Sequence, residues 1–430
     1  MSTAITGSVP DSPTAITASY LERTRLSAES YAQACKLMPG GTSRQASFWS
    51  PYPLTIDRGS GARFQDIDGH SYLDLINNYT AMVHGHAYPA IVAATQQQIA
   101  KGTAWAAANE PQNRLAELIV DRVPSVEQVR FTNSGSEAGV LAFTIARIIT
   151  GRTKLLMARY GYHGSPLEFE VGFFGNEGPL THLATYNDLA DFEAVLDEHG
   201  HDIAAVFLEP VMGASGVIQG DPDFLHGVRA AAHKAGVLFI LDEVLTLRFS
   251  SGGYQANIGI EPDLTMLGKI IGGGFPVGAV GGSADMLRIL DPSDLKVFHT
   301  GTFNANPVTM VAGEVSLCEL TSDRIKRMDH LCESLESGLI AAAKRHGLPF
   351  STNRYGSCLN IYFSQSAPEF SALRDDELLM DNFHLACMNH GLFIANRGLI
   401  ALSTVITDQD IAEALERADF AMRDVAAEVG

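Results

Sequence analysis

The chain has 430 residues, of which 46% are hydrophobic and 18% charged, values typical of a globular protein large enough for more than one domain. A formal charge of −19 at pH 7 argues against nucleic acid or an anionic membrane as a partner. No apolar run approaches the roughly 18 residues of a membrane span. The five cysteines show no CxxC spacing, so we expect reduced thiols in the cytoplasm and no metal site.

The N-terminal part of the chain predicts a tail followed by helices and short strands. Residues 1–18 are rich in Ser, Thr, Ala and Pro, which predicts a disordered tail and not a signal peptide. Helical spacing over 19–38 ends in Pro and Gly. Residues 54–74 predict short strands that turn at Asp68-Gly69, and a helical pattern resumes over 89–101.

From residue 113 onward, apolar runs alternate with helical spacing. This alternation predicts an α/β fold with a mostly parallel sheet, covered by helices on both faces. The predicted strands are 129–132, 154–158, 204–208, 237–241, 264–267 and 277–281, and the helices between them include 136–149, 188–199 and 223–235.

The pattern changes after about residue 321, to a long amphipathic helix over 323–346, short strands near 356–363 and 392–402, and a final helix from 408. We therefore expect a large domain over 76–320 and a smaller α+β domain over 321–430, which the segment 19–75 joins.

Two short stretches carry the strongest chemical signal. Residues 236–241 form an apolar run without alternation, which predicts a buried parallel strand, so Asp242 and Glu243 fall at its carboxyl end, where open sheets bind ligands. Lys269 follows an apolar segment and is soon followed by three glycines. A partly desolvated lysine suits a Schiff base, and an aspartate suits a pyridinium nitrogen, the two fixed points of a pyridoxal phosphate site. Taken alone, an Asp-Glu pair after a strand is usually a helix cap or a Mg²⁺ ligand.

Polar residues follow other predicted strands as well. Ser134-Gly135-Ser136 opens a helix, where free amides bind anions, although an ordinary cap has the same residues. Tyr162 and His163 lie between glycines, so the tyrosine would stack on a planar ligand or serve as a buried structural residue. Glu209 ends another strand, and Thr302 offers a further phosphate-binding hydroxyl. His84 and His86 lack a third ligand at suitable spacing, so we do not expect them to bind a metal.

The order of these motifs resembles the class III aminotransferases of fold type I, in particular the glutamate-1-semialdehyde aminomutase branch. The resemblance covers residue 30 or so to the end, and rests on residues 133–138, 161–164, 241–244, 267–274, 276–282 and 301–306. It implies a seven-stranded sheet and the cofactor pyridoxal 5′-phosphate. Lys269 would form the internal aldimine and move the proton, Asp242 would hold the pyridinium nitrogen, Val244 would pack behind the ring and Tyr162 in front.

The resemblance also implies how the phosphate is bound. Gly135 and Ser136 would hold it, with Thr302 reaching in from a second subunit, so we expect a homodimer with shared active sites. Ser134, His163 and Glu209 complete the residues that we expect to contact the cofactor.

The chain departs from the aminomutase pattern in the stretches 42–46 and 394–399, and in a shortened segment over 165–185. These departures resemble the β-amino acid aminotransferases of the β-phenylalanine type, whose early and late arginines bind carboxylates. The matching residues are Arg44 and Arg397, and a guanidinium fork suits a carboxylate. For each arginine, a surface ion pair is the alternative.

We therefore predict an aminotransferase that moves an amino group from a β-amino acid to a 2-oxo acid such as 2-oxoglutarate or pyruvate. Phe48, Trp49 and Tyr79 would wall the side-chain pocket, although core packing explains them too. The alternatives are an intramolecular glutamate-1-semialdehyde 2,1-aminomutase and a non-catalytic protein of the same fold.

Overall fold

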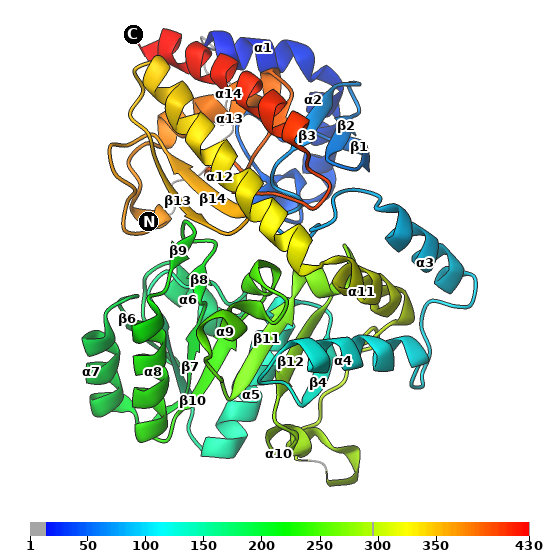
Figure 1. The fold of residues 1–430 in the computed structure, drawn as a ribbon, viewed down its shortest axis with the longest axis vertical. Helices are drawn as coiled ribbons and strands as arrows, with labels where there is room; N and C mark the ends of the chain where they lie inside the picture. The colour runs from blue at the N-terminus through cyan, green and yellow to red at the C-terminus, as the bar shows by residue number, and fades with distance from the viewer. Residues whose placement is uncertain (1–13, 295, 430) are drawn as a thin grey trace.

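The computed structural model describes residues 14–294 and 296–429. Its lower half in Figure 1 is built on a seven-stranded sheet of order β4-β12-β11-β10-β7-β5-β6. Neighbouring strands are parallel except for β12, which is antiparallel to both β4 and β11. The strands are β4 (Gln128–Thr132), β5 (Lys154–Ala158), β6 (Thr181–Ala184), β7 (Ile203–Leu208), β10 (Leu238–Asp242), β11 (Leu264–Gly268) and β12 (Gly278–Gly282).

Helices cover both faces of this sheet, and alternate strand residues belong to different cores. Leu156, Val206 and Leu241 pack in one cluster, whereas Leu155, Phe207 and Ile240 pack in another. Because successive side chains of a strand point to opposite faces, both faces are buried, as a parallel sheet requires. The helices of this half are α4 (Glu110–Arg122), α5 (Gly135–Thr150), α6 (Leu167–Phe173), α7 (Leu189–His199), α8 (Pro222–Lys234), α9 (Gly253–Ile258), α10 (Ala284–Leu287) and α11 (Pro307–Glu319).

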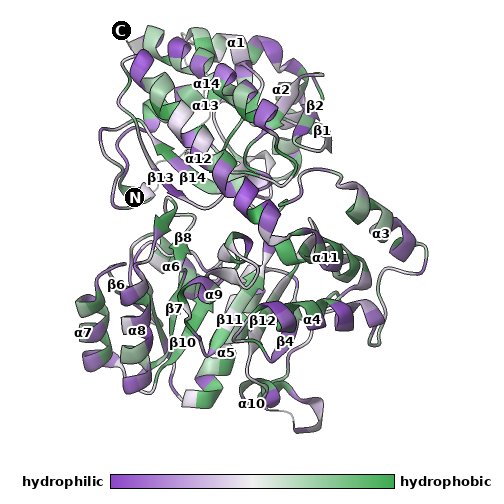
Figure 2. Cartoon of the chain, in the orientation of Figure 1, coloured by the Kyte–Doolittle hydropathy of each residue, from purple (hydrophilic) through white to green (hydrophobic). Residues whose placement is uncertain are grey.

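The predicted α/β fold with a mostly parallel sheet is confirmed. All six predicted strands form, each within one residue of its predicted ends. The sequence did not predict the edge strand β6, whose Thr-His-Leu-Ala run is short and only partly apolar. In Figure 2 the strands at the centre of this half are mostly green, and purple residues gather on the outer helices, as burial of the sheet demands.

The upper half of Figure 1 joins the two ends of the chain. Its N-terminal hairpin pairs with β15 through β3, in the order β1-β2-β3-β15, and β13-β14-β16 form a second small sheet. The hairpin turn predicted at Asp68-Gly69 is confirmed, because β2 and β3 are antiparallel neighbours. The elements are α1 (Ala15–Arg23), α2 (Arg25–Leu37), β1 (Ile56–Ser60), β2 (Arg63–Asp66), β3 (Ser71–Asp74), α12 (Ser322–Arg345), β13 (Ser351–Tyr355), β14 (Cys358–Tyr362), α13 (Glu377–Asn389), β15 (Leu392–Phe393), β16 (Leu399–Ala401) and α14 (Asp408–Val429).

Two further elements complete the described chain. Helix α3 (Pro89–Ile99) packs against α11, and the short ribbon of β8 (Val211–Met212) and β9 (Ile218–Gln219) contacts β13. None of the helices in the described part of the chain combines the length and apolarity needed to cross a membrane. The domain boundaries that we derived from the sequence stay a prediction.

The predicted tail over 1–18 is wrong at its end. Residues 1–13 lie outside the described residues, but α1 begins at Ala15, and Thr14 caps it by accepting the amide N–H of Thr17. Ile16 and Tyr20 anchor α1 because both side chains are buried in the core of the upper half. The prediction failed because it rested on the average composition of the segment and not on the burial of single apolar residues.

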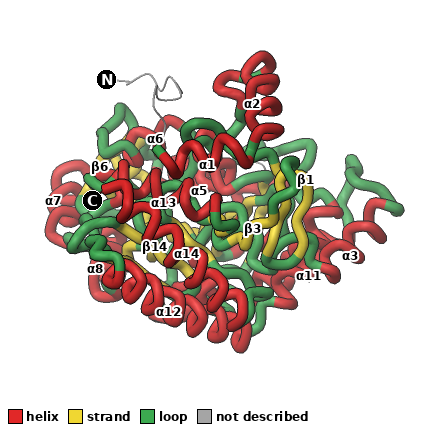
Figure 3. Tube along the Cα trace, turned by 90° about the horizontal axis from the view of Figure 1, so that it is seen from above, coloured by secondary structure: helices red, strands yellow, loops and turns green. Residues whose placement is uncertain are grey.

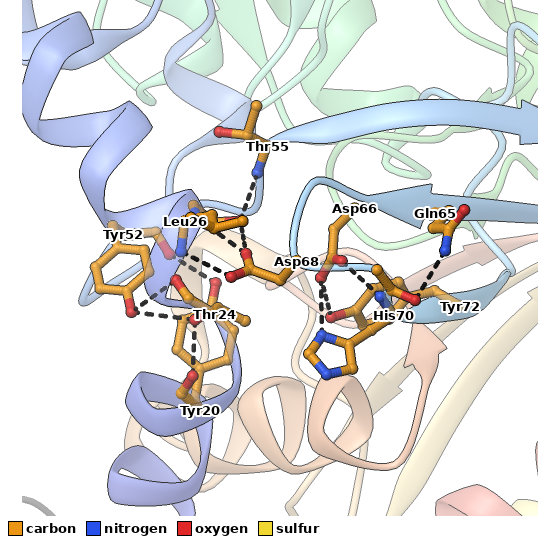
Figure 4. A network of polar contacts seen from close by, with 12 residues as sticks. Tyr20, Thr24, Leu26, Tyr52, Thr55, Gln65, Asp66, Asp68, His70 and Tyr72 are labelled. Atoms are coloured by element: carbon orange, nitrogen blue, oxygen red, sulfur yellow. Dashed lines mark hydrogen bonds and ion pairs between the residues drawn. The ribbon is translucent and has the colours of Figure 1, made fainter.

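A polar network fixes the N-terminal helices to the hairpin (Figure 4). The predicted single helix over 19–38 is broken at Thr24, whose hydroxyl donates to the carbonyl of Tyr20 and forms no capping hydrogen bond to α2. Asp68, at the hairpin turn, accepts the first amides of α2 instead, from Leu26 at 2.7 Å and Ser27 at 3.0 Å. Seen from above, α2 projects from the body of the molecule (Figure 3), and Ser27 is its buried residue. Since few side chains of α2 are packed, the hydrogen bonds from Asp68 stabilise the start of this helix.

Candidate active site

The carboxyl ends of five strands meet at one edge of the large sheet. Strands β4, β11, β10, β7 and β5 all run in the same direction, because β12 is antiparallel to both of its neighbours. The residues that follow these strands include most of those singled out in the sequence: Ser134, Gly135 and Ser136 after β4, Tyr162 and His163 after β5, Glu209 after β7, Asp242 and Val244 at the end of β10, and Lys269 after β11.

Asp242 is buried, with 4% of its surface exposed, and both its carboxylate oxygens are hydrogen-bonded. His163 contacts Oδ2 through Nδ1 at 2.9 Å, and the amide of Val244 donates to Oδ1 at 3.0 Å. These partners hold the carboxylate in one orientation. The other ring nitrogen of His163 is buried and has no partner among the described residues.

Glu243, the neighbour of Asp242, has a different task. It is fully buried and accepts the amides of Tyr254 at 3.0 Å and Gln255 at 2.8 Å. Both amides lie in the first turn of α9, where backbone N–H groups have no acceptor within the helix. The helix-cap interpretation therefore applies to Glu243 and not to Asp242.

Lys269 lies immediately beyond β11 in a left-handed backbone conformation, with φ of 48°. Burial lowers the pKa of its ammonium group, while the carboxylates of Glu209 and Asp242 act in the opposite direction. The preceding Gly268 lets the backbone pass close to Val244, because a Cβ at that glycine would lie 3.2 Å from a Val244 methyl. An amine with a lowered pKa is a better nucleophile near neutral pH.

Glu209 is the second buried carboxylate of the site, with 6% exposed. It accepts the amides of Tyr162 at 2.8 Å and Gly213 at 3.1 Å. Burial raises the pKa of its carboxyl to about 7. Glu209 thus holds the loop that carries Tyr162, whose ring is 40% exposed and packs edge-to-face on Phe173 at 5.2 Å.

Two side chains accept backbone amides at the N-terminus of α5. The Ser134 hydroxyl accepts the amide of Glu137 at 3.1 Å, and the Glu137 carboxylate accepts the amide of Asn133 at 2.8 Å. Ser134 is therefore occupied as a cap, and the amides at the start of the helix, beginning with Gly135 and Ser136, have no intrahelical partner. Such a helix start favours an anion.

Two neighbouring segments approach this helix start. A Cβ on Gly164 would lie 2.4 Å from the Ser136 hydroxyl oxygen, so the loop after β5 fits here only as glycine. Asn304 contacts the side chain of Asn133 at 2.6 Å, which brings the loop of Thr302 beside α5. Thr302 itself is exposed in the single chain.

The predicted substrate residues lie together at a second place. The guanidinium carbons of Arg44 and Arg397 lie over one tyrosine ring, that of Tyr79, at 5.6 Å and 5.1 Å from its centroid. Within residues 14–294 and 296–429, neither arginine forms an ion pair with a carboxylate: Arg44 donates to the amide oxygen of Asn78 at 2.7 Å, and Nε of Arg397 is buried without a partner. The surface ion pair that we considered for each arginine is not formed.

Other candidate residues have structural partners. Trp49 donates its indole N–H to Tyr20 and packs on His384 at 5.1 Å, so core packing explains it. His84 contacts Thr404 and the carbonyl of Ser316, whereas His86 contacts Asp74.

Comparison with known proteins identifies the family. The family model described as aminotransferase class-III matches residues 46–169 and 175–422. The chain belongs to the class III aminotransferases. It is therefore an enzyme, and its cofactor is pyridoxal 5′-phosphate. The residues described above fit this cofactor, since they provide a lysine of lowered pKa, a buried carboxylate and a helix start suited to a phosphate.

Three relatives illustrate the range of the family. The chain is 41% identical over 384 residues to a β-phenylalanine transaminase from Variovorax paradoxus, covering 87% of this chain and 88% of the relative. It is 37% identical over 416 residues to glutamate-1-semialdehyde 2,1-aminomutase 2 from Bacillus anthracis, covering 91% and 96%. Among solved structures, an omega-transaminase from Sphaerobacter thermophilus matches with a TM-score of 0.88 at 36% identity, over 93% of this chain and 97% of that one.

Sequence reasoning singled out Tyr79 in this aminotransferase but missed the backbone conformation of the segment that carries it. Asn77, Asn78, Tyr79 and Thr80 all have positive φ, which we did not predict. The pair of asparagines was the available signal, because asparagine tolerates the left-handed region better than most residues.

Proposed function

We propose that this aminotransferase moves an amino group from a β-amino acid, of the aromatic β-phenylalanine type, to a 2-oxo acid such as 2-oxoglutarate or pyruvate. The observation that carries the proposal is the pair of guanidinium groups, of Arg44 and Arg397, over the ring of Tyr79, without a carboxylate partner among the described residues. A positive charge held near a cofactor site without a counter-ion favours an anionic ligand. The 41% identity to a β-phenylalanine transaminase supports the same donor class.

Pyridoxal phosphate, when bound, supplies the electron sink that makes the amino-bearing carbon acidic. We propose that Lys269 holds the cofactor and then moves a proton to and from that carbon. Burial lowers its pKa, so a larger fraction of the amine is neutral and able to accept a proton at neutral pH. Asp242, oriented by His163, would stabilise a positive charge at the ring nitrogen.

The remaining cofactor contacts follow from the strand ends. Val244 and Tyr162 would enclose the two faces of the ring, with the Tyr162 loop held by Glu209. The amides of Gly135 and Ser136 would bind the phosphate, next to the cap formed by Ser134.

We propose that a second copy of the chain completes the site. Thr302 is exposed, and its neighbours Phe298 and Phe303 are 80% and 61% exposed, an unusual state for large apolar side chains. A homodimer that covers this loop would bury both rings and bring Thr302 to the phosphate of the partner.

At the substrate end, we propose that Arg397 and Arg44 bind the carboxylates of donor and acceptor. Both half-reactions use one site, so the same cations serve an amino acid and a 2-oxo acid in turn. Burial lowers the pKa of the Arg397 guanidinium, a cost that a bound carboxylate would offset. The five free cysteines support the expectation of a cytoplasmic enzyme.

The aminomutase stays the second candidate, because the chain is also 37% identical to a glutamate-1-semialdehyde 2,1-aminomutase over most of both lengths. An aminomutase moves the amino group within one molecule and needs no acceptor. The two activities are therefore separable in one assay.

The purified enzyme is incubated with racemic β-phenylalanine and 2-oxoglutarate, and glutamate is measured. We expect glutamate only when both substrates are present, and no product from glutamate-1-semialdehyde alone. Rapid conversion of the semialdehyde without an acceptor, and none of any β-amino acid, would establish the aminomutase instead.

A further inference from the structure

The segment Asn77–Thr80 is a short left-handed turn made entirely of non-glycine residues, with φ of 49°, 50°, 52° and 75°. L-residues are disfavoured in this region, and β-branched Thr80 most of all. Four such residues in succession persist only where their surroundings hold them, and strained backbone of this kind concentrates at functional sites.

Hydrogen bonds hold the beginning of the turn in place. The amide of Met82 donates to the carbonyl of Asn77 at 3.0 Å, and that of Thr80 to Ile76 at 3.1 Å, which closes the turn. The buried side-chain amide of Asn77 donates to the carbonyl of Ala401 at 2.8 Å, which fixes the turn to β16.

Arg248 holds the other end. It is among the largest fully buried side chains of the described protein, and in that part of the chain it forms no ion pair. Its guanidinium group donates to the carbonyl of Thr80 at 3.3 Å, to the Ser357 hydroxyl at 3.1 Å, and to the carbonyl of Leu402. Burying a cation costs free energy unless its N–H groups are hydrogen-bonded. These bonds therefore hold the guanidinium group in place, and they also hold the carbonyl of Thr80 in place.

The turn presents Tyr79 to the substrate end of the site. The Tyr79 hydroxyl donates to the carbonyl of Ala46, and Arg44 donates to Asn78, so the turn also orders the segment that carries Arg44. Asn396, next to Arg397, donates to the carbonyl of Phe48 in the same segment at 3.1 Å. Thus both arginines depend on where the turn places Tyr79.

We propose that Arg248 is a positioning residue for carboxylate recognition. By holding the carbonyl of Thr80, it maintains the left-handed turn that sets Tyr79 between the segments of Arg44 and Arg397. Arg248 itself does not touch the substrate, and its role rests on the proposed function, in which these two arginines bind the carboxylate.

The test compares two donors that differ only in the carboxylate, β-phenylalanine and 1-phenylpropan-1-amine. Each half-reaction is followed by the absorbance change of the bound cofactor. The quantity compared between variants is the ratio of kcat/KM for β-phenylalanine to kcat/KM for the amine. In Arg248→Lys the charge remains but the fork that reaches several acceptors is lost. We expect the ratio to fall about 10-fold or more, through a higher KM for β-phenylalanine, with little change in the rate for the amine.

Arg122→Lys is the matched control. Arg122 also donates to backbone carbonyls, those of Ser251 at 3.0 Å, Leu320 at 2.7 Å and Leu317, none of which belongs to the turn. We expect this variant to lose thermal stability but keep the wild-type ratio. An unchanged ratio in Arg248→Lys, or an equal fall in both variants, would overturn the proposal.

A second pair of variants covers the case in which Arg248→Lys does not fold. Asn77→Ala and Asn77→Gly both remove the bond to Ala401, but only glycine accepts positive φ without strain. We expect the ratio to fall further in the alanine variant than in the glycine variant, and equal ratios would overturn the proposal. A wild-type enzyme that does not distinguish the two donors would refute the proposed function itself, and the inference with it.

Discussion

The two ends of the site are built in different ways. At the cofactor end, each residue lies at the end of a strand of one rigid sheet. Its partner is close in the chain, as with Asp242 and Val244, or follows another strand of the same sheet, as with His163. At the substrate end, Arg44, Tyr79 and Arg397 come from three loops far apart in the sequence, tied by single hydrogen bonds. In the proposed function, the sheet positions the residues that carry out the chemistry, whereas loops that hold one another position the residues that select the substrate.

This comparison predicts that changes at the cofactor end abolish turnover of every donor. The largest effect is expected for Lys269→Ala, which removes the only amine proposed to move the proton. We expect activity to fall to background and the absorbance band of the lysine-bound cofactor to disappear, while thermal unfolding stays cooperative. Near wild-type turnover in this variant would contradict the role of Lys269.

Asp242→Asn tests the same end with less disruption of shape. The amide retains the volume of the carboxylate, but loses the negative charge and disturbs the contact with His163. Removing one partner of a buried charge pair costs about 3–5 kcal/mol, which corresponds to roughly 150- to 5000-fold in kcat/KM. We expect that loss for β-phenylalanine and for 1-phenylpropan-1-amine alike. A loss confined to one donor would contradict the claim that the cofactor end acts on every donor.

Changes at the substrate end are expected to depend on the donor. Arg397→Met removes a charge-assisted hydrogen bond to the carboxylate, worth about 1.5–3 kcal/mol, or roughly 10- to 100-fold in kcat/KM. We expect this loss for β-phenylalanine and almost none for the amine without a carboxylate. Arg44→Met should have the same direction and a smaller size, because Arg44 is more exposed than Arg397. Equal losses for both donors would show that Arg397 is only structural.

The smallest expected effect is a change in pH dependence at Glu209. Burial raises the pKa of this carboxyl from 4.5 to about 7 in the folded protein, so the folded state holds its proton more tightly than the unfolded state. The stability that the raised pKa contributes is full below pH 4.5 and is lost as pH rises through about 7, by up to about 3 kcal/mol. In Glu209→Gln we expect the free energy of unfolding of the cofactor-free protein to vary less between pH 5 and 8 than in the wild type. A steeper variation in the variant would contradict the assignment.

The same contrast explains what the sequence could predict. The strands were found because continuous apolar runs such as that of β7 are a local signal, and the residues after them follow directly. The start of the helix at Ser134 was also a local signal. The left-handed turn at Asn77–Thr80, by contrast, is imposed by Arg248 and Ala401, which lie far along the chain. The cap that Asp68 provides to α2 escaped prediction for the same reason.

The structure also assigned tasks that residue type alone left open. Asp242 and Glu243 are adjacent carboxylates at the same strand end, yet one faces His163 and the other caps α9. Only the direction of each side chain, which alternates along a strand, separates the two roles.

The most direct test of the account is the preference of the wild-type enzyme between β-phenylalanine and 1-phenylpropan-1-amine, with 2-oxoglutarate as acceptor. Because two arginines without a carboxylate partner are proposed to bind the substrate carboxylate, we predict that kcat/KM is at least about 100-fold higher for β-phenylalanine than for the amine. Equal values for the two donors, or no turnover of β-phenylalanine while the amine reacts, would contradict the account.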